Sequence, residues 1–257
     1  MEVFANQLVA ILLVSLRIAP TFAFTPPFTL MRIPATARLL LAIGLAAWMT
    51  LANPSATYER LSPEAPLVVF ALAELLLGIT LSLSLQIAFA AILTAGRALD
   101  IQVGFALAQI ADPTLRTQMP LVGTLFAYAT AAAFFAANGP AELLAIWSHS
   151  LETMPLGAFG PDHDLSALLS FIGAAFVIAL AIGGGVMLVL FLTDMAIASL
   201  SRTLPQMNVL MLGFQVKTLA LLMTLPFVFA FSGALFLRLI RLALGAAGDE
   251  RQWVALN

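Results

Sequence analysis

The stretch TAGRALDIQVGFALAQIADPTLRTQMP, residues 94–120, decides how the rest of the chain is interpreted. It places charged and amide side chains among apolar ones, namely Arg97, Asp100, Gln102, Gln109, Asp112 and Arg116. Long segments with almost no charge flank it on both sides. A lipid-facing helix does not tolerate so many polar groups, and a surface loop would contain fewer large apolar side chains. The stretch therefore predicts a semi-polar re-entrant element or plug that other protein protects, with an ordinary loop with amphipathic ends as the alternative.

Local signals within this stretch predict its internal structure. Arg97 and Asp100 stand three residues apart, so one helical turn would bring them together as an ion pair. Gly104 permits a bend or a close approach of the backbone. Asp112 followed by Pro113 is typical of a helix N-cap and first-turn proline. We therefore expect a short helix to begin after Pro113.

Composition excludes several classes of protein. The chain has 257 residues, of which 62% are hydrophobic and 9% are charged, and its mean hydropathy is +1.05. A soluble domain of this size does not bury enough surface to hide so many apolar side chains, which indicates an integral membrane protein or part of an assembly that leaves the membrane with its partners. The net charge of -2 argues against nucleic-acid binding, which requires a basic face. Because the chain has no cysteine, disulfides, thiolate metal sites and cysteine nucleophiles are excluded.

Six apolar segments approach or exceed the roughly 20 residues that a helix needs to cross a bilayer. They are residues 7–24, 35–51, 66–93, 119–137, 166–192 and 209–240. Several are interrupted: the first by Arg17 and Pro20, the third by Glu74, and the last by Lys217 and Pro226. The last is also long enough to form two half-helices. The pattern predicts an all-α, membrane-associated fold of about six long hydrophobic, partly kinked or broken helices arranged as helical hairpins.

Charges inside these segments are informative. Arg17, Glu74, Asp194 and Lys217 would each cost at least about 2.5 kcal/mol if left bare in lipid, so each must pair or face a polar interior. They line a pathway or pin helices together as structural ion pairs, and both interpretations stay open. The arginine and lysine bias of the connecting segments favours an extracytoplasmic N-terminus, while the arginines of the C-terminal tail favour the opposite orientation.

No catalytic or metal-binding constellation stands out. The two histidines, His149 and His163, both lie in the acidic connection after residue 138, and helical metal spacing is missing there. A solvated loop is the expected structure for residues 138–165. The triplet Gly183–Gly185 lies in an apolar segment, where it favours close helix packing or a kink over phosphate binding. We therefore predict no enzymatic activity, no metal and no cofactor.

A specific motif occurs near the C-terminal end. The stretch RTLPQMNVLMLGFQVK, residues 202–217, fits R-x-x-P-Q-x-N-V-x-x-x-G-x-x-x-K and resembles the signature of the FliR family of flagellar biosynthetic proteins, which includes the type III secretion SctT proteins. Residues 94–105 resemble the central segment of that family. AELLLG at 73–78 matches its E-x-x-x-G, and FAANG at 135–139 matches its asparagine-glycine turn. Pro140 is a mild departure from that turn.

This resemblance implies a function and partners. FliR-like proteins are subunits of the flagellar type III export gate, in the bacterial inner membrane within the basal body. With FliP and FliQ they form the channel through which unfolded flagellar proteins pass, and FlhB packs at its entrance. The resemblance further implies a FliP-like part at about residues 1–190 and a FliQ-like hairpin at about 191–257.

The resemblance also assigns roles to residues. A plug in the channel lumen would map onto Gly104, Phe105, Leu107, Gln109, Ile110, Asp112, Pro113 and Met119. Pro205, Asn208 and Gly213 are turn-competent residues. The region of Arg202, Pro205, Gln206, Asn208 and Gly213 is therefore expected to form a tight hairpin that contacts a neighbouring subunit or the FlhB-like partner. Independently of the resemblance, the cost of bare charges in an apolar segment predicts that Arg17, Glu74, Arg97, Asp100 and Lys217 are buried structural charges.

A secondary transporter of a small solute is the competing function. Broken helices and charges near the middle of the membrane are typical of such transporters as well. However, the chain has no internal half-repeat and no pair of equivalent interrupted segments. Uptake of a solute by this chain alone would favour the transporter.

Overall fold

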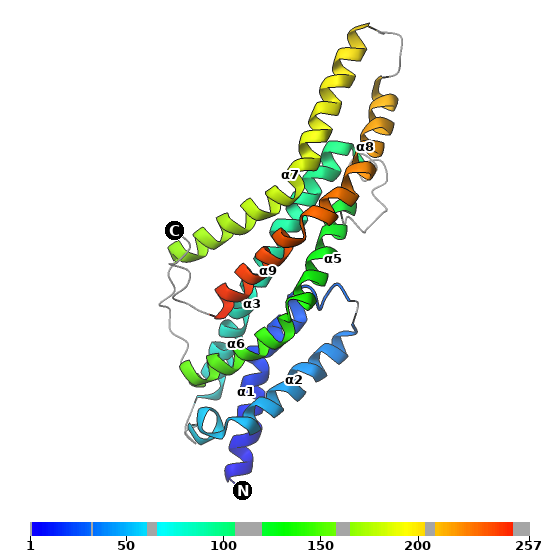
Figure 1. Ribbon diagram of the computed structural model, residues 1–257. Helices are drawn as coiled ribbons and strands as arrows, with labels where there is room; N and C mark the ends of the chain where they lie inside the picture. Colours follow the sequence, from blue (N-terminus) through cyan, green and yellow to red (C-terminus); the bar gives the residue numbers. More distant parts are fainter. Residues whose placement is uncertain are drawn as a thin grey trace. The chain divides into compact units, whose positions relative to one another are not determined.

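The computed structural model describes residues 2–31, 33–60, 66–105, 120–157, 165–203 and 209–248, and Figure 1 shows the course of the chain through its helices. Within these ranges all regular structure is helical. The helices are α1 (Glu2–Phe24), α2 (Ala35–Ala52), η1 (Pro54–Ala56), η2 (Tyr58–Arg60), α3 (Leu67–Val103), α5 (Leu121–Ala136), α6 (Gly139–Thr153), α7 (Leu165–Thr203), α8 (Val209–Phe231) and α9 (Gly233–Gly248). The predicted all-α fold is confirmed.

The membrane-spanning potential also agrees with the sequence. Among the residues that the structure describes, five helices are long and apolar enough to cross a membrane, namely α1, α2, α3, α7 and α8. A sixth span is possible if α5 and α6, which meet at a 68° bend, are counted as one broken span. The last apolar segment is interrupted at Ser232, between α8 and α9, as expected for two half-helices. About six hydrophobic helices, some of them broken, are therefore confirmed.

The central stretch differs from its prediction at its beginning. The helix α3 continues for 37 residues as far as Val103, so residues 94–103 extend a long helix and are no part of a separate re-entrant element. The helix tolerates their polar groups because each finds a partner or the surface. The Thr94 hydroxyl donates to the Ala90 carbonyl oxygen at 2.7 Å, and Asp100 and Gln102 bind neighbouring helices. Residues 106–119, including the expected helix after Pro113, lie outside the described residues.

The expected loop at 138–165 is wrong over its first half, where α6 forms. Asn138 adopts a left-handed conformation with a φ of 59° and makes the turn out of α5. Pro140 then occupies the first turn of α6, where its missing N–H has no helical acceptor. Gly139 packs against the Phe134 ring, which leaves no room for a Cβ atom. The buried side chains of α6 recur at helical spacing: Leu143, Ile146, Trp147, Ser150 and Leu151.

The chain forms two compact units, and each helix that crosses the boundary contributes to both. The first comprises Met1–Ile87, Phe134–Ile172 and Arg241–Asn257, and the second Ala88–Ala133 and Gly173–Ile240. In the first unit α1 packs against α2. Its buried core includes Ala10, Val14 and Ile18 of α1 and Ala42, Ala46 and Met49 of α2. The division near residue 190 that the family resemblance implies stays a prediction.

The second unit is built around an aromatic cluster. Phe126 of α5 is completely buried, and its ring meets the rings of Phe229 and Phe236 edge-on at centroid distances of 5.8 and 6.1 Å. Gly183 of α7 lies opposite Leu99 and Phe126, so it serves close helix packing. Gly96 of α3 and Gly123 of α5 approach so closely that a Cβ atom on Gly96 would overlap the Gly123 backbone. This crossing brings the last turns of α3 beside the first turn of α5.

Candidate functional site

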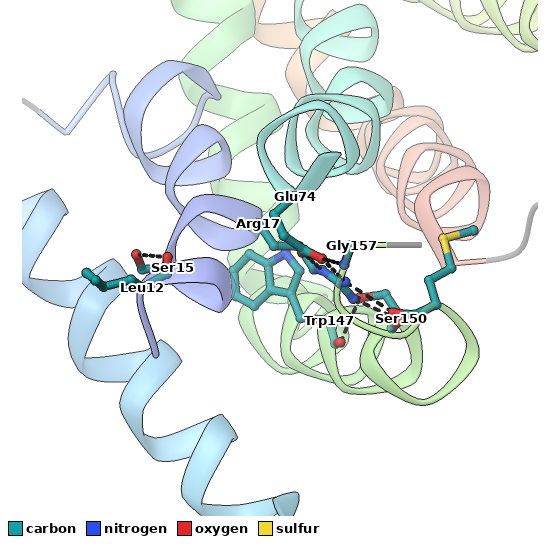
Figure 2. Close-up of polar contacts among 8 residues, drawn as sticks. Leu12, Ser15, Arg17, Glu74, Trp147, Ser150 and Gly157 are labelled. Atoms are coloured by element: carbon teal, nitrogen blue, oxygen red, sulfur yellow. Dashed lines mark hydrogen bonds and ion pairs between the residues drawn. The ribbon is translucent and has the colours of Figure 1, made fainter. Parts of the chain in front are cut away.

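Arg17 lies on α1 and is completely buried. Its Nε donates to Oε2 of Glu74 at 2.6 Å, and its Nη2 donates to Oε1 at 2.9 Å. Figure 2 shows the two side chains pointing toward each other from α1 and α3. Glu74 is itself 1% exposed. Such a two-point contact between a guanidinium and a carboxylate is stronger and more directional than a single ion pair.

The remaining donors of Arg17 bind the C-terminal end of α6. Nη1 donates to the Ser150 carbonyl oxygen at 2.9 Å and to its Oγ at 3.2 Å, and Nη2 donates to the Met154 carbonyl oxygen at 3.1 Å. The Ser150 carbonyl oxygen also accepts from the Met154 N–H at 2.9 Å, and the carbonyl groups at a helix C-terminus carry partial negative charge. The buried guanidinium therefore neutralises Glu74 and caps α6 at once.

Glu74 also holds the turn that follows α6. Its Oε1 accepts a hydrogen bond from the Gly157 N–H at 2.9 Å. Gly157 has a φ of 81°, and a Cβ atom there would overlap the Phe70 ring. The ion pair thus joins α1, α3 and the end of α6 into one structure, which we call the Arg17 cluster (Arg17, Glu74, Ser150, Met154 and Gly157).

The E-x-x-x-G motif has a direct physical explanation here. Gly78 lies one turn after Glu74, and a Cβ atom on it would overlap the Arg17 carbonyl oxygen. The glutamate binds the arginine side chain, while the glycine lets the backbones of α1 and α3 approach at the same arginine. Both positions of the motif therefore serve one contact.

Arg38 repeats the capping principle at another helix end. It lies in the first turn of α2, and its Nη1 donates to the carbonyl oxygens of Phe22 and Ala23 at 3.1 and 2.8 Å. These are among the last carbonyl groups of α1. A cation at a helix C-terminus is favourable for the same electrostatic reason as in the Arg17 cluster.

In the second unit, the negatively charged Asp100 caps the N-terminal end of a helix, whereas Arg17 and Arg38 bind C-terminal ends. Its carboxylate is buried, and both oxygens accept from the Val122 N–H, at 3.1 and 3.2 Å. Val122 lies in the first turn of α5, where unpaired N–H groups favour a negative charge. The predicted Arg97–Asp100 pair is therefore wrong: Arg97 is exposed on another face of α3, and the α5 backbone takes the Asp100 carboxylate.

Lys217 of α8 reaches the same end of α3. Its Nζ lies 2.5 Å from Oδ1 of Asp194 on α7 and donates to the Gln102 carbonyl oxygen at 3.2 Å. The Gln102 side chain donates in turn to the Met187 carbonyl oxygen of α7 at 3.2 Å. We call this group the Lys217 cluster (Lys217, Asp194, Gln102 and Met187).

The four charges expected inside the membrane thus form two ion pairs, Arg17–Glu74 and Lys217–Asp194. Their surroundings differ. The side chains of the first pair are 1% and 2% exposed, and those of the second are 20% and 41% exposed.

The other predicted site residues are placed only in part. Gly104, with a φ of 102°, follows the last residue of α3, and the Phe105 ring meets the Phe214 ring at 6.1 Å. Arg202 is exposed near the end of α7. Gly213 lies inside α8 and faces Ile197, so it packs two helices together and is not part of a turn. Outside the described residues lie Leu107, Gln109, Ile110, Asp112, Pro113, Met119, Pro205, Gln206 and Asn208.

Sequence reasoning missed the partners of these charges. Ser150 lies 133 residues after Arg17, and Val122 lies 22 residues after Asp100. A backbone carbonyl or N–H leaves no residue-type signal in the sequence. The Asn138-Gly139-Pro140 run was the available sign of α6, because it combines a turn residue with a first-turn proline.

Comparison with known proteins decides the family. Residues 8–243 match the family described as bacterial export proteins, family 1. The chain belongs to this family. It is 32% identical to the flagellar biosynthetic protein FliR of Bacillus subtilis (strain 168) over 215 residues, which are 81% of each chain. It is 29% identical to FliR of Aquifex aeolicus (strain VF5) over 227 residues, 86% of this chain and 87% of that protein.

A relative from a secretion system also matches. The Yop proteins translocation protein T of Yersinia pestis is 26% identical over 148 residues, 56% of this chain and 57% of that protein. The resemblance to the FliR family that the 202–217 signature indicated is confirmed. The chain is a component of a flagellar or type III export apparatus, and its apolar helices make it a multi-pass membrane protein.

Proposed function

We propose that the chain is a subunit of the flagellar type III export gate in the bacterial inner membrane, within the basal body. With FliP-like and FliQ-like subunits it forms the channel through which unfolded flagellar proteins leave the cell. An FlhB-like partner packs at the entrance. The family and the names of its flagellar relatives support the proposal.

One structural observation carries the assembly part of the proposal: α8 is a long apolar helix that the described part of the chain leaves almost uncovered. Only 17% of the most apolar 18-residue stretch of α8 is buried. Its exposed large side chains include Met211, Phe214, Leu219, Leu222, Met223, Phe227 and Phe231. A helix that is apolar on all sides needs a covering of lipid or protein. We assign that covering to the neighbouring gate subunits.

The segment at 105–121 is the proposed plug of the channel. A lumen wide enough for an unfolded chain would leak ions unless something filled it at rest. Phe105, Leu107 and Ile110 would pack across the lumen, and Gln109 and Asp112 would keep the segment from binding there irreversibly. Its two ends support this role, because the Asp100–Val122 contact joins α3 to α5 across it. The two stems on either side of the proposed plug are therefore held together.

The end of the α7–α8 hairpin is the proposed contact with a neighbouring subunit or the FlhB-like partner. Arg202 is exposed there, and Pro205, Gln206 and Asn208 follow it in the chain. Single cysteines at Gln206 and Asn208 are unambiguous probes because the chain has no native cysteine. We expect each to crosslink to a partner cysteine in the assembled complex. Free labelling of both by a bulky maleimide would show that no partner covers them.

Export by a deletion strain tests the function itself. We expect a strain without this chain to lose export of flagellar proteins and motility, and a plasmid copy to restore both. Export at the normal level in the deletion strain would contradict the proposal. Accumulation of a small solute in vesicles that contain this chain alone would favour a transporter instead.

A further inference from the structure

We propose that Lys217 is a positioning residue that couples the α7–α8 hairpin to the C-terminal end of α3, and so sets the direction in which the chain leaves α3 at Gly104 and Phe105. Its consequence for ion leakage rests on the plug proposed above. The coupling itself concerns only contacts among described residues.

The first step is the chemistry of the Lys217 contacts. The Gln102 carbonyl is one of the last four of α3, a group without a partner further along that helix. Lys217 Nζ donates to it at 3.2 Å while the same nitrogen is paired with Asp194. One ammonium therefore binds a group on α7 and a group on α3 from its position on α8. No two of these helices can separate at this point without breaking one of its bonds.

The second step is that Gln102 is held from two directions. Its main-chain oxygen binds Lys217 of α8, and its side chain donates to the Met187 carbonyl oxygen of α7. Phe105, just beyond Gly104, adds a ring contact with Phe214, which lies three residues before Lys217 on α8. The last turn of α3 and the two residues after it are thus bound to α7 and α8, so a displacement of the α7–α8 hairpin would displace them as well.

The third step is that this coupling is open to adjustment. The Lys217 and Asp194 side chains are 20% and 41% exposed, so a neighbouring chain or water can reach the pair. The Arg17–Glu74 pair, at 1% and 2%, is closed to both. A partner that shifts the hairpin or competes for Asp194 would therefore move the end of α3, whereas the Arg17 cluster would not respond.

The test is a distance measurement in the complex assembled with FliP-like and FliQ-like subunits that lack cysteine. Spin labels on cysteines at Ile101 of α3 and Met211 of α8, both exposed, report how α3 sits against the hairpin. Lys217→Met removes both bonds and keeps an unbranched chain of similar length. We expect its distance distribution to shift or broaden beyond that of the parent, and Lys217→Arg to restore the parent distribution. An unchanged distribution in Lys217→Met would overturn the coupling.

Two further variants keep the test decisive. Lys217→Met combined with Asp194→Asn removes both bonds of Lys217 without leaving Asp194 as an unpaired charge, so this double variant replaces Lys217→Met if that complex does not assemble. Its unchanged distribution would likewise overturn the proposal. Thr218→Val is the matched control, because the Thr218 hydroxyl bonds back to the Phe214 carbonyl within α8. We expect it to leave the distances unchanged, and a shift as large as that of Lys217→Met would overturn the assignment to Lys217.

Resting ion conductance separates this inference from the proposed function. If trimming residues 106–112 leaves the complex as tight as the parent, the plug is wrong, and the spin-label distances still decide the coupling. If the trimmed complex leaks, we expect Lys217→Met to leak as well and Lys217→Arg to stay tight. A leaky trimmed complex together with a tight Lys217→Met complex of unchanged distances would overturn the coupling alone.

Discussion

Replacing Glu74 by alanine is the sharpest perturbation of the Arg17 cluster. The change removes both acceptors of the Arg17 guanidinium, at 2.6 and 2.9 Å, and the acceptor of the Gly157 N–H. Arg17 keeps its bonds to Ser150 and Met154 but remains as an uncompensated charge that is 0% exposed. Removing one partner of a buried ion pair costs about 3–5 kcal/mol.

A loss of that size is readily measured. It lowers the ratio of folded to unfolded chain by roughly two to three and a half orders of magnitude, since about 1.4 kcal/mol corresponds to a factor of ten. The Gly157 N–H loses its acceptor in this variant, and this adds to the loss of stability if water does not replace the carboxylate. Added salt should leave the effect unchanged, because screening acts weakly on a pair that is 1% and 2% exposed.

The assay uses the absence of native thiols. A cysteine in place of Ala46, which is completely buried on α2, becomes reactive to maleimide only when the first unit opens. We expect Glu74→Ala to label at a lower denaturant concentration than the parent within the assembled complex. Glu142→Gln, on the exposed face of α6, should stay within about 0.5 kcal/mol of the parent, as a surface change does. Equal labelling of the Glu74→Ala and parent complexes would refute the reasoning.

Three further predictions concern Gly78, Asp100 and residues 106–112. Gly78→Ala should destabilise the first unit by about 1–3 kcal/mol because its Cβ atom meets the Arg17 carbonyl oxygen, whereas Gly44→Ala, with open space around it, should be neutral or stabilising in the same labelling assay. Asp100→Ala should cost about 0.5–2 kcal/mol through the lost cap of α5, and hydrogen exchange at Val122 should accelerate; unchanged exchange would contradict the cap. Trimming residues 106–112 should leave the complex assembled but raise its resting conductance in planar bilayers, with export persisting or becoming less regulated, and a trimmed complex as tight as the parent would reduce the segment to a structural loop.

The sequence predicts the fold class because hydrophobic length and charge depletion are local properties. The six apolar segments, the break inside 209–240 and the need of Arg17 and Lys217 for partners all follow from the bilayer as a solvent. The position of the E-x-x-x-G motif is also visible in the sequence. Its reason is not, because only the fold shows that Glu74 and Gly78 face the same arginine.

The predictions for Asp100 and for residues 138–165 fail for two physical reasons. The sequence favours pairing Asp100 with Arg97, since a local helix brings the two together, but the Val122 N–H in the first turn of α5 binds the Asp100 carboxylate instead. The sequence favours a loop where α6 forms, because the exposed face of this helix carries Glu142, His149 and Glu152. Polar residues on one face of an amphipathic helix and polar residues in a loop have the same composition, and only the periodicity of the buried positions separates them.

Native mass spectrometry of the chain expressed alone and together with FliP-like and FliQ-like subunits tests the central claim most directly. The exposed apolar helices predict that the chain alone is unstable and proteolysed, and that co-expression yields one large detergent-stable complex containing all three kinds of subunit. A well-behaved monomer that gains nothing from the partners would contradict the assignment to the export gate.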